Sequence, residues 1–347
     1  MSPLKAPERV VGIDFGTSSV RGVEVTTHPK KGPQVRRFAR IALPSGAVED
    51  GEVMEPNTVG DALKRLWEKG SFSTNKVALG VGNQRVLVRP FTVDDQPASR
   101  VREALPALVE EILPFRSEDA LIDFYPIERH PNDAGRVNGL VVAAAKHAID
   151  EAVRAIRIAK LRTHRVDLIP FALSRVHLWG EYSNGTIALI YQAPSSTTVL
   201  IATNRVPRFV RIIPAGDEDV TAHMEQVLGL GHEELTAELA TRPRAQDPQR
   251  FNEAMGEASE QIAKAAHGTA YYWANSTGQK IDTVLLSGRN MHSPAVFERF
   301  SGLFGDITKI AHPTGGFGLH DTISAEEMRI AAPSAAIGLA MGGESWL

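Results

Sequence analysis

Short apolar runs separated by turn residues divide the first part of the chain into strands and an amphipathic helix. Strands are predicted at about 9–15, 20–27 and 34–43, and the turn-rich segment 28–33 separates the second from the third. Apolar residues at helical spacing predict a helix over 57–69, and residues 76–81 return to strand character. This order, β-β-β-α-β, predicts an α/β lobe that opens with a meander.

The next segment, 84–165, is predicted to be a self-contained α+β insert. Its apolar pattern gives strands at 85–91, 121–129 and 136–145, and helices at 99–112 and 147–160.

The second half of the chain repeats the opening meander. After a short helix that follows residues 166–170, strands are predicted at 185–191, 196–203 and 205–213. Residues 217–274 are mostly helical, interrupted by the polar loop 242–248; a buried strand at 281–286 and a small-residue helix at 331–340 follow. A repeat of one supersecondary unit predicts two related lobes.

Composition narrows the classes of function. The chain has 347 residues, 43% of them hydrophobic, a formal net charge of -3 and no cysteine. Zero cysteines exclude disulfides, Cys-ligated zinc and thiol catalysis, and the charge gives no reason to expect nucleic-acid binding. Without a run of about 18 apolar residues, we expect a cytoplasmic protein with no direct membrane insertion.

The strongest chemical signal is the turn between the first two strands, Asp14-Phe15-Gly16-Thr17-Ser18-Ser19. Gly16 allows a sharp bend, Thr17, Ser18 and Ser19 offer hydroxyl and amide hydrogens to phosphate oxygens, and Asp14 is a candidate Mg²⁺ ligand. An ordinary hairpin with a polar tip would show the same residues. A D-x-G-T/S-S hairpin is also the first phosphate loop of actin-like ATPases.

Several further segments resemble the PilM family, the actin-like proteins of type IV pilus assembly that are related to FtsA. The resemblance runs nearly end to end and is carried by residues 42–53, 112–115 with 122–124, 166–167 with 170–173, and 332–340. It implies a two-lobed actin-like ATPase (RNase H-like) α/β fold with an FtsA-like 1C insert subdomain.

The resemblance also implies a subdomain order. Subdomain 1A would comprise 1–83, 166–185 and 313–347; 1C would be the insert 84–165; 2A would comprise 186–216 and 281–312; and 2B would be 217–280.

The resemblance places a nucleotide between the lobes, but this chain departs from the family pattern there. Tyr191 and Ala193 replace the aspartate and glycine of the second phosphate loop, Arg289 replaces a glycine after Gly288, and Ala240 replaces a lysine two residues after Glu238. The other candidate nucleotide contacts in the second lobe are Ser195, Ser196, Thr197 and Gly216.

These departures predict a degenerate ATPase with very slow or no hydrolysis and no catalytic residue to assign, because phosphoryl transfer depends almost entirely on charge positioning. ATP and Mg²⁺ are the candidate cofactors, since the first loop still offers a phosphate cradle. The resemblance implies a scaffold whose 1A–1C groove captures the N-terminal peptide of a PilN-like membrane protein and is held at the inner membrane by it. Alternatives are an active phosphotransferase of the actin and sugar-kinase superfamily, or an FtsA-like filament protein.

Overall fold

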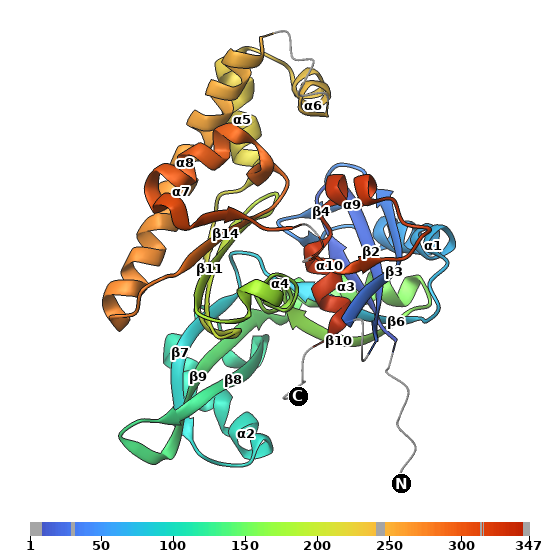
Figure 1. The fold of residues 1–347 in the computed structure, drawn as a ribbon. Helices are drawn as coiled ribbons and strands as arrows, with labels where there is room; N and C mark the ends of the chain where they lie inside the picture. The colour runs from blue at the N-terminus through green and yellow to red at the C-terminus, as the bar shows by residue number, and fades with distance from the viewer. Residues whose placement is uncertain (1–8, 29–31, 241–246, 313, 315, 343–347) are drawn as a thin grey trace.

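Two twisted sheets form the centres of two lobes, shown in Figure 1. The computed structural model describes residues 9–28, 32–240, 247–312, 314 and 316–342. The first sheet has the strand order β10-β6-β1-β2-β3-β16. Its strands are β1 (Val11–Phe15), β2 (Ser19–His28), β3 (Gly32–Ala42), β6 (Lys76–Val81), β10 (Arg162–Leu168) and β16 (Gly318–Leu319).

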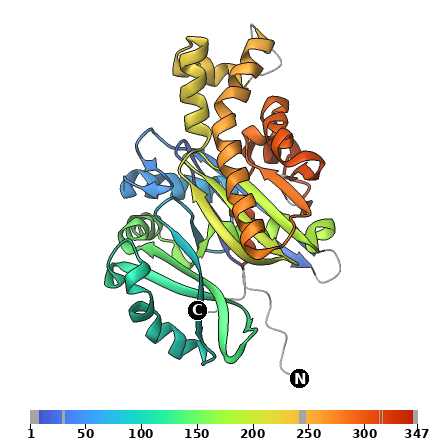
Figure 2. The ribbon, with the colours of Figure 1, turned by 90° about the vertical axis from the view of Figure 1, so that its left-hand side faces the viewer.

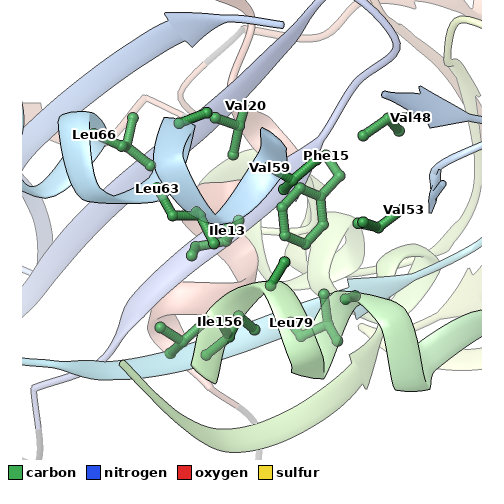
Figure 3. Close-up of a cluster of buried hydrophobic side chains, with 14 of the residues drawn as sticks. Ile13, Phe15, Val20, Val48, Val53, Val59, Leu63, Leu66, Leu79 and Ile156 are labelled. Atoms are coloured by element: carbon green, nitrogen blue, oxygen red, sulfur yellow. The ribbon is translucent and has the colours of Figure 1, made fainter. Parts of the chain in front are cut away.

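The core of the first lobe lies between this sheet and two helices, α1 (Pro56–Gly70) and α3 (Lys146–Ile158). Figure 3 shows Leu63 and Leu66 of α1 and Ile156 of α3 packed around Ile13 and Phe15 of β1. The short hairpin of β4 (Val48–Glu49) and β5 (Glu52–Val53) closes one end of this cluster with Val48 and Val53.

Two more helices, α4 (Ile169–His177) and α10 (Ser334–Met341), pack together on the other side of the first sheet. Their contact is so close that a Cβ on Gly338 would lie 2.0 Å from the carbonyl oxygen of Ala172. A Cβ on Gly12 of β1 would likewise lie 2.0 Å from the carbonyl oxygen of Ala336. The predicted small-residue helix beneath the first lobe is therefore confirmed, and α9 (Ala325–Ala331) precedes it.

The insert is a three-stranded sheet with the order β7-β9-β8, covered by one helix. It consists of β7 (Leu87–Asp94), α2 (Ala98–Val109), β8 (Ala120–His130) and β9 (Asp133–Ala145). The range 84–165 expected for it is too long, because α3 packs in the first-lobe core and β10 pairs with β6 of the first sheet. A helix and a strand that follow the insert in sequence thus belong by packing to the first lobe.

The second lobe is built on a sheet with the order β13-β12-β11-β14-β15. Its strands are β11 (Thr186–Gln192), β12 (Thr197–Thr203), β13 (Val206–Ile213), β14 (Thr283–Ser287) and β15 (Thr308–Ile310). Its helices are α5 (Asp217–Leu228), α6 (His232–Ala240), α7 (Pro248–Thr277) and α8 (Pro294–Phe304). Figure 2 shows the long α7 running across one face of this sheet, where its apolar stripe is buried.

The insert also contacts the second lobe. Arg208 of β13 forms an ion pair with Glu128 of β8 at 2.7 Å. On the first-lobe side, the ring of Tyr125 of β8 lies 4.9 Å from that of Phe171 on α4. The insert is therefore held by both lobes.

The sequence predicted most of these elements within a few residues, including both meanders and β6. It missed strand β10, helices α8 and α9, and the short strands β4, β5, β15 and β16. Residues 29–31 of the predicted turn at 28–33 and residues 242–246 of the predicted loop at 242–248 lie outside the described residues. Within the described ranges, no helix combines the length and apolar character needed to cross a membrane.

Candidate functional site: the cleft between the lobes

The first hairpin brings Asp14 and Arg21 face to face. β1 and β2 pair so that Asp14 lies directly opposite Arg21, and their side chains form an ion pair with 2.9 Å between Oδ2 and Nη2. Both side chains are largely buried, at 8% and 12% exposure. Arg21 also donates from Nη1 to the carbonyl oxygen of Ala331 at 2.8 Å.

The charges around Arg21 explain its ionisation. Burial disfavours the charged guanidinium, but the negative charge of Asp14, with smaller effects from Tyr191 and Asp217, outweighs burial and raises the pKa of Arg21. Arg21 therefore stays charged, and its guanidinium lies beside the carboxylate of Asp14, which the sequence analysis named as a candidate Mg²⁺ ligand.

Several polar groups of the turn already have hydrogen-bond partners within the protein. The backbone N–H of Gly16 donates to the carbonyl oxygen of Ser19 at 3.0 Å, and Leu43 N–H donates to the carbonyl oxygen of Ser18 at 3.0 Å. The hydroxyl of Ser19 is buried and accepts a hydrogen bond from Nε of Arg40 at 3.0 Å. Thr17 and Ser18 are the more exposed residues of the turn.

The second hairpin is closed by the start of α5. The N–H groups of Asp217 and Glu218 donate to the carbonyl oxygens of Ala193 and Pro194 at 3.0 Å and 2.8 Å. Gly216 permits this contact, because a Cβ there would lie 2.4 Å from the carbonyl oxygen of Ala193. The free N–H groups of a helix N-terminus ordinarily attract phosphate. Here the N–H groups of Asp217 and Glu218 are occupied by the loop.

Charge at the same helix end also opposes an anion. The first turn of α5 carries Asp217, Glu218 and Asp219, and the carboxylate of Asp219 accepts the N–H of Gly216 at 2.8 Å. Thr197 is fully buried, and its hydroxyl donates to the carbonyl oxygen of Ala215 at 2.7 Å. These groups stabilise the loop rather than present donors to a ligand.

Tyr191 lies buried between the two hairpins. Burial, followed by the negative charge of Asp14, raises the pKa of its phenol, so the side chain is neutral. It therefore supplies no carboxylate where the family pattern has an aspartate.

Arg289 marks the rim of the cleft on the second lobe and is exposed. Gly288, just before it, has a φ of +126°, and a Cβ there would lie 2.5 Å from the carbonyl oxygen of Gln192. Across the cleft, the pKa of Arg40 is lowered first by burial and then by the positive charges of Arg289 and Arg21. The positive charge of Arg289 on the second lobe therefore reaches Arg40 of the first lobe.

A cavity between the hairpins gathers only part of the expected site. Asp14, Gly16, Thr17, Tyr191, Ala193, Ser195 and Ser196 line it together with Arg21, whereas Ser18, Ser19, Thr197, Gly216, Gly288, Arg289 and Glu238 do not. Glu238 lies on α6, which packs against α5 on the helical part of the second lobe (Figure 1). The side chain of Ala240 lies outside the described residues.

The cavity measures about 60 Å³, whereas small-molecule pockets measure about 300–1,000 Å³. With Asp14 paired to Arg21 and the α5 N–H groups occupied, the residues of the cleft do not fit a magnesium–nucleotide complex in this arrangement. Among the described residues, no group of three or more metal-binding side chains gathers elsewhere either.

The cavity continues to the junction of the first lobe with the insert. Val86, Ala144, Ala145, Ala148, Ile149 and Ile169 give it an apolar lining there. Buried Glu52 accepts hydrogen bonds from Nδ2 of Asn83 at 2.6 Å and from Nη1 of Arg85 at 2.9 Å, which ties the β4–β5 hairpin to the start of the insert.

Sequence reasoning missed Arg21 and the Glu52–Asn83–Arg85 cluster. The signal for Arg21 was present, because a tight hairpin that pairs residues 15 and 20 must also place 14 opposite 21.

Comparisons with known proteins identify a matching family and solved structures of the same fold. Residues 12–344 match the family model of the type IV pilus assembly protein PilM. The fold resembles a solved PilM-PilN type IV pilus biogenesis complex with a TM-score of 0.81 and 20% identity, over 96% of this chain and 97% of that chain. It also resembles the ethanolamine utilization protein EutJ from Carboxydothermus hydrogenoformans, with a TM-score of 0.61 and 13% identity, over 99% and 92%. The expected two-lobed actin-like α/β fold is confirmed.

Proposed function

This chain belongs to the type IV pilus assembly PilM family, and we propose that it is a cytoplasmic scaffold that binds the N-terminal peptide of a PilN-like membrane protein. The observation that carries the proposal is the end-to-end match, insert included, to the fold found in a PilM-PilN complex. Such a scaffold reaches the inner membrane through its partner, and its own chain needs no membrane-crossing helix.

The apolar end of the cleft cavity, between the first lobe and the insert, is the proposed anchor point of the peptide. An extended peptide gains affinity from backbone pairing and specificity from a few apolar side chains seated in pockets. Ala144, Ala145 and Ala148 leave room there because their side chains are small. The anchored Glu52 cluster keeps the β4–β5 hairpin and the start of the insert in fixed positions beside it.

Calorimetry with the partner's first ten or so residues tests this assignment. Ala148 is half-buried and lines the cavity, so Ala148→Phe is expected to fill the anchor point and to weaken binding at least tenfold. Ala134→Phe, at the exposed start of β9, is the matched control and is expected to bind like the parent protein. Equal affinity in both variants would show that the peptide docks elsewhere.

Cell fractionation gives a second test. The protein is expected in the membrane fraction when its partner is present and in the soluble fraction when the partner lacks its N-terminal peptide. Membrane association that persists without the peptide would contradict recruitment by the partner.

We further propose that the scaffold does not turn over ATP. The support is the Asp14–Arg21 ion pair, together with neutral Tyr191 at the position of the family's second-loop aspartate. Purified protein with ATP and Mg²⁺ is expected to release phosphate no faster than a protein-free control. Release that Asp14→Asn abolishes would favour the alternative of an active phosphotransferase.

A further inference from the structure

A second depression, on the outer side of the first lobe, gathers cationic side chains. It has a volume of about 440 Å³ and is lined by β2, β3, the end of α1 and the segment that follows β16. We call it the basic pocket; its charged side chains are Arg9, Arg36, Arg37, Lys69 and the acidic Glu24. Four cations and one anion give it a positive balance, although the whole chain carries a formal net charge of -3.

A β-bulge places two of these arginines side by side. Glu24 pairs with Arg37 and Val25 pairs with Val35, so that Arg36 is the extra residue of β3. Neighbouring strand residues normally point to opposite faces, and a bulge locally re-aims a side chain. As a result, Arg36 and Arg37 both line the basic pocket.

Glu24 fixes one wall of the pocket. Its side chain is only 2% exposed and accepts hydrogen bonds from the N–H of Ser73 at 2.8 Å and from the Ser73 hydroxyl at 2.5 Å. It also forms an ion pair with Arg37 at 3.4 Å. The buried carboxylate therefore positions Arg37 and the turn that follows α1.

The other three cations have neutral partners within the described part of the chain. Arg9 donates to the Ser73 hydroxyl at 3.2 Å, Arg36 to the side-chain oxygen of Gln34 at 3.3 Å, and Lys69 to the carbonyl oxygen of Arg40 at 3.2 Å. Cations gathered on a concave wall raise the local concentration of anions. The forked guanidinium groups match the geometry of phosphate oxygens.

We propose that the basic pocket binds a phosphate group, carried by a small soluble compound or by the headgroup of an anionic phospholipid. Its volume lies within the range of about 300–1,000 Å³ that small-molecule sites occupy. The pocket shares no lining residue with the cleft cavity, so this proposal is independent of peptide binding.

Two binding measurements on the full chain separate the two sources of phosphate. Calorimetry with inorganic phosphate in a phosphate-free, low-salt buffer probes the soluble compound. Co-sedimentation with phosphatidylglycerol vesicles, compared with phosphatidylcholine vesicles, probes the headgroup. Binding in calorimetry alone assigns a soluble ligand, and binding to vesicles alone assigns a lipid headgroup. Either result supports phosphate binding in the basic pocket.

Charge reversal links the binding to the pocket. Arg36 and Lys69 are exposed, so Arg36→Glu and Lys69→Glu leave the core untouched, and each is expected to weaken binding at least tenfold. Lys280→Glu changes an exposed lysine in the segment that follows α7; it is the matched control and is expected to bind like the parent protein. The proposal is overturned if neither probe binds, or if the Lys280 variant loses as much affinity as the other two.

Discussion

Removing Arg21 is the most direct test of the buried ion pair in the first hairpin. Arg21→Met keeps the length and apolar volume of the side chain and deletes the guanidinium. Asp14 is left as a buried carboxylate without a counter-charge, and the carbonyl oxygen of Ala331 loses its donor. Breaking a buried ion pair from one side costs about 3–5 kcal/mol, so we expect Arg21→Met to lower the free energy of unfolding by about 4 kcal/mol.

A double-mutant cycle separates the charge effect from lost packing. Asp14→Asn alone leaves Arg21 buried without its carboxylate and is also expected to cost about 3 kcal/mol or more. Asp14→Asn/Arg21→Met removes both charges and is expected to cost no more than the worse single variant. The resulting coupling energy is about 3 kcal/mol.

Urea unfolding followed by circular dichroism measures all four proteins, with the free energies taken from the midpoints and a shared slope. Arg154→Met is the control, because its ion pair with Glu151 is 3.5 Å long and solvent-exposed and such pairs contribute about 0–1 kcal/mol. The reasoning is refuted if the double variant costs the sum of the two singles within about 0.5 kcal/mol.

Three other predictions concern stability. Burial, followed by the charge of His312, lowers the pKa of His177 to about 3, so the unfolded chain takes up a proton below about pH 6.5 while the folded protein does not. The stability due to neutral His177 is complete above pH 6.5, and about 2 kcal/mol of it is lost at pH 5. Between pH 7 and pH 5, the urea midpoint of His177→Gln is expected to fall less steeply than that of the parent protein. Parallel curves for the two proteins would contradict this. Gly216→Ala is expected to lower the melting temperature by several degrees because its Cβ would lie 2.4 Å from the carbonyl oxygen of Ala193, whereas Gly231→Ala, with nothing within 4 Å, is its control. Gly338→Ala is expected to separate α10 from α4, since its Cβ would lie 2.0 Å from the carbonyl oxygen of Ala172, and unchanged thermal unfolding would rule out the close packing of these helices.

The sequence by itself determined the local elements and their grouping into two lobes. Apolar periodicity and turn residues are local signals, so strands β1 and β6, the second meander and helix α1 could all be predicted from short windows. The small residues of the tail likewise determined a closely packed helix, because only glycine and alanine allow two backbones to approach so near.

Tertiary structure alone decided which segments belong together and what the polar residues of the cleft do. The pattern of α3 resembles that of any amphipathic helix, and only packing assigns it to the first lobe instead of the insert. Asp14 carries the same carboxylate in a metal site or an ion pair, and the hairpin register places Arg21 beside it. The N–H groups at the start of α5 could bind an anion, but in the fold those of Asp217 and Glu218 donate to the carbonyl oxygens of the 193–194 turn. The packing of α3 and the contact of the 193–194 turn with α5 depend on residues distant in sequence, which no local pattern encodes. The place of Arg21, by contrast, follows from the register of the first hairpin.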